Sequence, residues 1–228
     1  MNLKLAVGTV LAVCLSGCVS TEAMLASMSE VTPESVVASV DIKNDSLDVT
    51  ATLTTRRAFQ EPQTLFGTGE EAFIRAFVDK STGRISYQVY HVSNYMGNWR
   101  FYSLVNYETP SGPRQVQASV ISRDVVSCSS SLGCFYQETV TFEIPGDLMR
   151  TMADMYVPGQ ALAGWKYKIM GQSGAEVEHA ILAAEIVGAV MATEQLATRI
   201  GHPVPDPYEP KPSPLTVVPP SSLAASTQ

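Results

Sequence analysis

The chain has 228 residues, of which 45% are hydrophobic and 16% are charged. This length and composition fit one domain with a buried core, and they exclude a disordered, a collagen-like or a small disulfide-framework protein. A formal net charge of −7, with thinly spread basic residues, argues against nucleic acid as a partner, because phosphate contacts need clustered Lys and Arg side chains.

Residues 1–17 predict an export signal. Lys4 precedes an apolar stretch over residues 5–15, which has the length of a signal-peptide core and is too short to span a bilayer. The stretch ends in Leu15-Ser16-Gly17-Cys18, which resembles the lipobox of bacterial lipoproteins. The resemblance covers only this leader, and the globular part resembles no family.

The resemblance implies that the mature protein is anchored to a membrane by lipid. In that family the signal is cut before the cysteine, which then carries acyl chains such as palmitate, so Cys18 is the implied lipidation site and first mature residue. An Asp after this cysteine retains enteric lipoproteins in the inner membrane, so Val19 implies the outer membrane and a periplasmic location. The alternative is an ordinary signal peptide in which a cysteine stands by chance.

Two of the four cysteines are expected to form a disulfide. Cys14 leaves with the signal, and Cys128 and Cys134 remain in an oxidising compartment, which favours a bond between them. A catalytic redox pair usually has the tighter C-x-x-C spacing. A structural zinc site needs further Cys or His ligands, and none lies near in the sequence. We therefore expect a structural disulfide, and no metal or cofactor.

The mature chain begins with a predicted tether over residues 18–35, in which Thr32 and Pro33 have the pattern of a helix N-cap and first helical residue. A period of two and intervening turn residues then predict strands. These strands cover residues 47–54, 72–78, 85–92, 99–107, 115–120 and 135–144.

The C-terminal third supplies the helices. Residues 145–156 indicate a short amphipathic helix, residues 165–170 a last strand, and residues 176–198 a long helix with apolar residues at i, i+3, i+4 spacing. Glu185 in its middle argues against a membrane span. For residues 36–201 we expect an α+β fold, with an antiparallel β-meander sheet of about six or seven strands packed against the long C-terminal helix and the shorter one.

Residues 202–228 form a proline-rich tail in which X-Pro pairs alternate. This composition predicts an extended, disordered segment. Docking of the tail on a partner, or passage across an envelope layer, stays open as an alternative.

The sequence offers few candidate catalytic or metal-binding residues. The three histidines, His91, His179 and His202, fall in different predicted elements, and no motif joins them to a nucleophile. We therefore predict no catalytic residue. The spacing of Met149, Met152 and Met155 is better explained by core packing than by copper binding. The acidic set of Asp41, Asp45 and Asp48 is better explained by a solvated turn than by calcium binding.

Aromatic residues gather in two neighbouring predicted strands and the turn between them. Alternation along a strand sends about half of such residues outward, where Tyr and Trp suit contact with sugar or protein. The alternative is that both faces are covered. The possible binding surface consists of Tyr87, Tyr90, Tyr95, Trp99 and Tyr102, with Phe101 and Tyr107 nearby.

The sequence thus predicts a lipid-anchored cell-envelope protein with an assembly or protein-interaction role, not an evident enzyme. Its sheet edge or aromatic face would meet an envelope protein partner. The alternative is an envelope enzyme or carrier acting on peptidoglycan, lipid or another small ligand. An exposed aromatic patch would favour the first hypothesis, and a deep pocket with titratable groups would favour the second.

Overall fold

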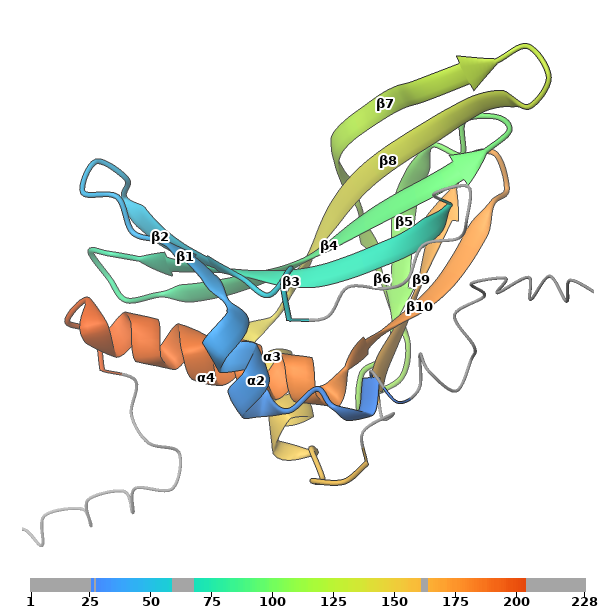
Figure 1. The fold of residues 1–228 in the computed structure, drawn as a ribbon. Coiled ribbons are helices and arrows are strands. Elements are labelled where there is room, and N and C mark those ends of the chain that lie inside the picture. The colour runs from blue at the N-terminus through green and yellow to red at the C-terminus, as the bar shows by residue number, and fades with distance from the viewer. Residues whose placement is uncertain (1–25, 27, 59–67, 161–163, 204–228) are drawn as a thin grey trace, which may run out of the picture.

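The computed structural model describes residues 26, 28–58, 68–160 and 164–203 (Figure 1). The predicted signal peptide, Cys18, half of the predicted tether and nearly all of the proline-rich tail lie outside these residues. In chain order the described elements are α2 (Pro33–Ser39), β1 (Asp41–Lys43), β2 (Thr50–Thr54), β3 (Gly69–Asp79), β4 (Ile85–Met96), β5 (Tyr102–Tyr107), β6 (Arg114–Gln117), β7 (Ser119–Ser129), β8 (Gly133–Ile144), α3 (Gly146–Asp154), β9 (Gly164–Gly171), β10 (Glu176–Leu182) and α4 (Ala183–Arg199).

The fold is α+β, as predicted, and its strands are antiparallel and pack against the C-terminal helix. They form a six-stranded sheet in the order β1-β2-β3-β4-β8-β7 and a four-stranded sheet in the order β10-β9-β5-β6. The sequence predicted one sheet of fewer strands. The difference arises where the chain changes sheets: Ala118 still donates its N–H to Ser103 of β5, while Ser119 already pairs with Thr141 of β8. A period of two continues through such a step, so the pattern does not reveal it.

The long predicted helix is shorter than expected. Residues 176–182 form β10, which pairs along its whole length with β9, and α4 begins only at Ala183. In β10 the side chains of Glu176, Glu178 and Ala180 are exposed and alternate with more buried ones, so the segment fits a period of two as well as a helical period. The hairpin partner β9 decides between the two, because all seven residues of β10 pair with it.

Other element bounds differ at their ends. β2 begins at Thr50, because Leu47 and Val49 are 92% and 79% exposed and lie before the paired residues. β4 continues to Met96 through residues predicted as a turn, because β8 pairs with it as far as Phe135. The predicted helix start is confirmed, since the amide of Ser35 donates to Thr32 Oγ1 at 3.1 Å and the Ser35 hydroxyl accepts from the Thr32 amide at 2.9 Å.

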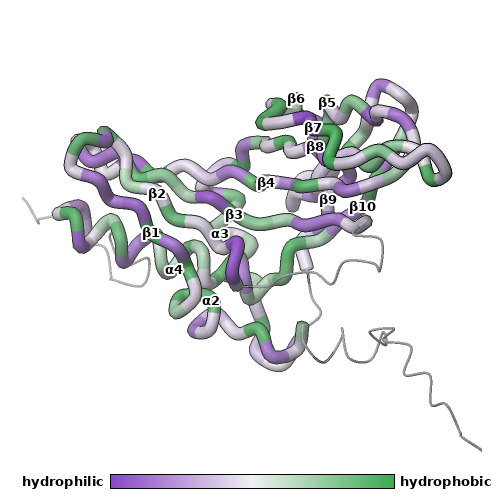
Figure 2. The backbone as a smooth tube through the Cα atoms, turned by 45° about the horizontal axis from the view of Figure 1, so that its top comes forward, coloured by the Kyte–Doolittle hydropathy of each residue, from purple (hydrophilic) through white to green (hydrophobic). Residues whose placement is uncertain are grey.

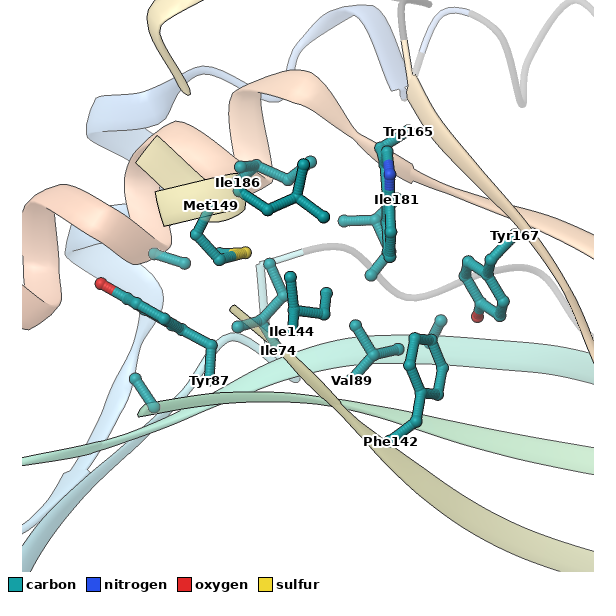
Figure 3. Close-up of a cluster of buried hydrophobic side chains, with 14 of the residues drawn as sticks. Ile74, Tyr87, Val89, Phe142, Ile144, Met149, Trp165, Tyr167, Ile181 and Ile186 are labelled. Carbon is teal, nitrogen blue, oxygen red and sulfur yellow. The ribbon is translucent and has the colours of Figure 1, made fainter. Parts of the chain in front are cut away.

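The core lies between the six-stranded sheet on one side and the helices with the four-stranded sheet on the other (Figure 3). Along several strands hydrophobic and hydrophilic residues alternate (Figure 2), whereas β3 carries apolar residues on both faces. Helix α2 packs closely on α4 because Gly188 has no side chain; a Cβ there would lie 2.4 Å from Val36 Cβ. The three methionines predicted to pack in the core differ: Met149 is fully buried and Met152 is partly buried, but Met155 is 71% exposed and is not part of the core.

Candidate functional site

Strands β7 and β8 form a long hairpin that extends away from the helices (Figure 1). A disulfide joins Cys128 to Cys134 near its tip, as predicted. β7 is an edge strand whose pairing is interrupted by bulges at Ile121 and Val126. Bulges twist an edge and break its ladder, so they hinder the addition of another strand. Contact through the side chains of this hairpin is therefore favoured over contact through its backbone edge.

The hairpin and the preceding β4–β5 connection carry more than half of the exposed large hydrophobic residues in the described part of the chain. Over residues 119–132 the charged side chains are those of Arg123 and Asp124. Exposed apolar residues with so few charges among them are typical of an interaction site. The exposed residues in this region are Met96, Phe101, Val120, Ile121, Val125, Val126 and Leu132.

Two aromatic side chains of the β4–β5 connection lie against this hairpin. The ring centroid of Trp99 is 4.5 Å from that of Tyr136 and 6.0 Å from that of Phe101. The Arg123 guanidinium lies 5.0 Å from the Phe101 ring centroid, and Val125 is the cross-strand partner of Tyr136. We call Trp99, Phe101, Val125 and Tyr136 the aromatic patch. Phe101 is 39% exposed, and Trp99 and Tyr136 are half-buried.

A buried carboxylate holds the loop that presents this patch. Glu138 is fully buried and accepts hydrogen bonds from the amides of Arg100 and Phe101 at 3.0 Å and of Tyr102 at 3.2 Å. It also accepts from the Tyr95 hydroxyl, and from Arg123 Nε at 3.0 Å. Burial raises the pKa of Glu138, but the hydrogen bonds from Tyr95, Arg123 and the amides outweigh it and hold the pKa below its ordinary value. The Glu138 carboxylate is therefore ionised at neutral pH. We call this carboxylate, together with its donors, the polar clamp.

The carbonyl groups of the same loop are held from the other side. Ser173 donates to the Arg100 carbonyl through its amide at 3.3 Å and its hydroxyl at 3.1 Å, and the Gln172 amide donates to the Phe101 carbonyl at 3.1 Å. Gly171 lets the two segments approach, because a Cβ there would lie 2.2 Å from the Arg100 carbonyl oxygen. Between these contacts Phe101 adopts φ of 53°, a left-handed conformation that is costly for a residue with a side chain. The loop is thus fixed before any partner arrives.

Most residues of the aromatic surface predicted from the sequence are not exposed. Tyr87, Tyr95 and Tyr102 are at most 3% exposed, because the helices, the polar clamp and the second sheet cover the face to which they point. Tyr90 is half-buried on the opposite face, stacked on Phe73 at 5.4 Å. Of the predicted set, only Trp99 lies in the aromatic patch. Tyr136 was missed, since its place beside Trp99 depends on the pairing of β4 with β8.

A second polar cluster joins residues that the sequence left apart. His91, fully buried in β4, places Nε2 2.7 Å from Glu70 Oε2 and Nδ1 2.9 Å from the Tyr167 hydroxyl. The Ser93 hydroxyl donates to Glu70 Oε1 at 2.9 Å. The His179 ring packs edge-on to that of His91, with 5.3 Å between centroids. The cluster therefore connects β3 and β4 of one sheet with β9 and β10 of the other.

His202 and the three aspartates considered for calcium binding make their contacts outside the second polar cluster. His202 Nε2 lies 2.8 Å from the Lys80 carbonyl oxygen, beside the β3–β4 turn. Asp41 pairs with Arg57, Asp48 pairs with Lys43, and Asp45 Oδ1 accepts from the Leu47 amide. No group of His, Cys, Asp and Glu in the described residues is arranged to hold a metal ion.

A cavity of about 670 Å³ lies along strand β10. Tyr167 and His179 of the second polar cluster are among its walls, together with Ala72 of β3 and Glu185 of α4. The structure thus contains both a partly exposed aromatic patch and a pocket with titratable groups.

Nothing matches this chain among protein-family models, curated proteins or solved structures. Within the described residues, no helix is long and apolar enough to cross a membrane.

Proposed function

We propose that this protein is a lipid-anchored interaction module of the cell envelope that binds a protein partner through the aromatic patch and the β7–β8 hairpin. One observation carries the proposal: a buried Glu138 and the 171–173 turn fix the Trp99–Phe101 loop from both sides in a strained conformation. Burying a carboxylate and straining a backbone both cost stability. Such costs are typical of sites where position matters for function.

The chemistry of the surface favours a protein partner over a sugar. Rigid aromatic side chains are effective anchors because little conformational freedom remains to be lost on binding. On the β7–β8 hairpin Val120, Ile121, Val125, Val126 and Leu132 are 45–62% exposed. These aliphatic groups cannot hydrogen-bond to sugar hydroxyls, but they complement an apolar protein surface. Residues 125–136 carry no charged side chain, so we expect the partner surface to be apolar as well.

Substitution of Phe101 by Gly tests the docking site without disturbing the fold. Glycine adopts the observed φ of 53° without strain, so we expect stability to be unchanged or slightly raised while the ring is lost. A photo-crosslinking residue at Val126, which is 54% exposed, should capture one specific envelope protein, and Phe101→Gly should reduce that product about tenfold or more.

The control places the photo-crosslinking residue at Leu47, which is 92% exposed and belongs to neither the patch nor the hairpin. This position should give no such product. Equal capture from Leu47 and Val126, or capture from Val126 that Phe101→Gly leaves unaltered, would contradict a partner at the aromatic patch.

The lipid anchor rests on the lipobox and is tested separately. We expect cells fed an alkyne analogue of palmitate to label the protein, and Cys18→Ala to abolish the label. Cys14→Ala is the matched control, since Cys14 lies in the same leader but before the predicted cleavage point. The label should persist in that variant. Labelling that survives Cys18→Ala would show that the lipobox does not direct acylation here.

A further inference from the structure

We propose that β10 is a second docking site, to which an extended segment of a protein partner adds as an antiparallel strand with apolar side chains on one face and basic side chains on the other. β10 lies at an edge of the four-stranded sheet (Figure 1). The aromatic patch involves β7, β8 and the β4–β5 connection. The inference therefore goes beyond the proposed function and does not depend on it.

β10 differs from the other three edge strands of the described residues. β1 and β6 have only three and four residues, and the pairing of β7 is interrupted by two bulges. Short length and bulges are usual protections of an edge against the addition of another strand. β10 has neither, since all seven of its residues pair with β9 without a shift of register. A further strand would therefore find a regular ladder on this edge.

The hydrogen bonds at the β9–β10 turn indicate which backbone groups of β10 point outward. The Gly171 amide donates to the Ala175 carbonyl at 2.8 Å, so these two residues form a hydrogen-bonded pair next to the ladder. Hydrogen-bonded and non-hydrogen-bonded pairs alternate along antiparallel strands. The N–H and C=O groups of Glu176, Glu178 and Ala180 therefore point away from β9 and toward the free edge.

The far side of β9 agrees with this alternation. Lys166, the partner of Ala180, uses its carbonyl to accept from the Glu108 amide at 3.3 Å, so its backbone groups are directed away from β10. Within the described residues the outward groups of Glu176, Glu178 and Ala180 make no hydrogen bond, and all three residues are exposed. Unpaired edge groups of this kind are a template for pairing with another chain.

The cavity along β10 leaves room beside this edge. Its volume is about 670 Å³, and Glu178 and Ala180 are among the residues that line it. Neighbouring strands of a sheet lie roughly 4.8 Å apart, so an added strand would occupy the space directly beside β10. Other walls of the cavity are apolar, and they include Met28, Ala72 and Leu182. These walls favour apolar side chains on the face of the added strand that turns toward them.

The exposed charges of β10 favour basic side chains on the other face. Lys168 Nζ lies 3.1 Å from Glu176 Oε2, and Lys168 is also the cross-strand partner of Glu178. Two carboxylates thus share one ammonium group, and Glu178 has no ion pair of its own with a described residue. In an added antiparallel strand, the residue opposite Glu178 lies on the same face as its side chain, where Lys or Arg would pair with it.

The first test uses a fluorescein-labelled peptide of about seven residues in which valine alternates with threonine and lysine, so that one face is apolar and the other basic. We expect saturable binding to the mature protein, measured by fluorescence anisotropy. In an antiparallel pair the residue opposite Glu178 points its N–H toward β10, so the threonine and lysine amides face β10 and the valine amides face away. Methylation of the threonine and lysine amide nitrogens should weaken binding at least tenfold, and methylation of the valine amide nitrogens should change it less than twofold.

Two substitutions test the protein side of the contact. Ala180→Pro removes an outward N–H but no bond to β9, so binding should fall about fivefold, the usual effect of one lost hydrogen bond. Glu178→Lys changes an exposed side chain, which keeps the test available if the proline variant does not fold. It should weaken binding of the lysine peptide about fivefold and strengthen binding of the same peptide with glutamate in place of lysine.

The matched control is Glu143→Lys, which makes the same change of charge at an exposed position of β8 and should leave both affinities within twofold. The proposal is overturned if the peptide shows no saturable binding, or if the two methylated peptides bind alike. It is also overturned if Glu178→Lys and Glu143→Lys have the same effect on the lysine and glutamate peptides.

Discussion

We expect Glu138→Ala to lower the free energy of unfolding by about 3 kcal/mol, the lower end of the range for breaking a buried ion pair, because the Arg123 side chain is 29% exposed. The substitution leaves the Arg123 guanidinium, the Tyr95 hydroxyl and three backbone amides without the acceptor they share. Buried donors without partners lose their hydration and gain nothing in return. Urea denaturation followed by circular dichroism measures the change.

The matched control is Glu143→Ala. Glu143 lies on the same strand as Glu138, but its side chain is exposed and points to the other face of the sheet. We expect a change within about 0.5 kcal/mol, as for surface substitutions in general. Comparable losses in the two variants would show that Glu138 is not a special structural element.

The pH dependence of stability provides a second test of the role of Glu138. Because the pKa of Glu138 in the folded protein is below the ordinary value of 4.5, its stabilising contribution is fully present above that value. It is lost as the pH falls through the lower folded-state pKa. The difference in stability between the unsubstituted protein and Glu138→Gln should therefore shrink as the pH falls below 4.5. A difference that grows under acid conditions would contradict an ionised clamp.

We expect Gly171→Ala to displace the Trp99–Phe101 loop and to lower the free energy of unfolding by about 1–3 kcal/mol, the usual cost of overpacking. A Cβ at this position would lie 2.2 Å from the Arg100 carbonyl oxygen and 3.0 Å from its carbon. Backbone atoms cannot rotate away as a side chain can, so the loop itself must move. Capture of the partner from Val126 should fall together with stability.

Gly146→Ala is the control for this substitution. Gly146 begins helix α3, and a Cβ there would meet only Tyr87 Cε2, at an ordinary contact distance of 3.9 Å. Alanine favours a helix, so we expect unchanged or slightly higher stability and undiminished partner capture. If Gly171→Ala matched Gly146→Ala in both measurements, the tight contact between the 171–173 turn and the loop would have no role in positioning the aromatic patch.

The elements were more predictable than their assembly. Period-two patterns placed most strands, and Thr32 with Pro33 marked the start of a helix, because these signals depend only on neighbouring residues. The Cys128–Cys134 disulfide was predictable for a related reason: few residues separate the two cysteines. β10 was mistaken for the start of the long helix, since its residues fit both periods and only pairing with β9 separates them.

The candidate sites were mostly hidden from the sequence. Glu138 is one of many acidic residues, and its role depends on a loop that follows β4 and on Arg123 of β7. His91 and His179 are far apart along the chain and meet only because the two sheets face each other. Trp99 was found among the aromatic residues, but Tyr87, Tyr95 and Tyr102 were misplaced, because alternation does not say which face a second layer covers.

By itself the sequence determined the α+β class, most of the strands, the disulfide and the expectation of a lipid anchor, since each depends on local spacing or composition. Only the tertiary structure decided that the ten strands of the described residues divide between two sheets, that a buried carboxylate clamps the Trp99–Phe101 loop and that Tyr167 and His179 line a cavity. The physical reason is that these features bring together residues from distant strands. Their free energies come from burial and hydrogen bonding between elements, which no local pattern encodes.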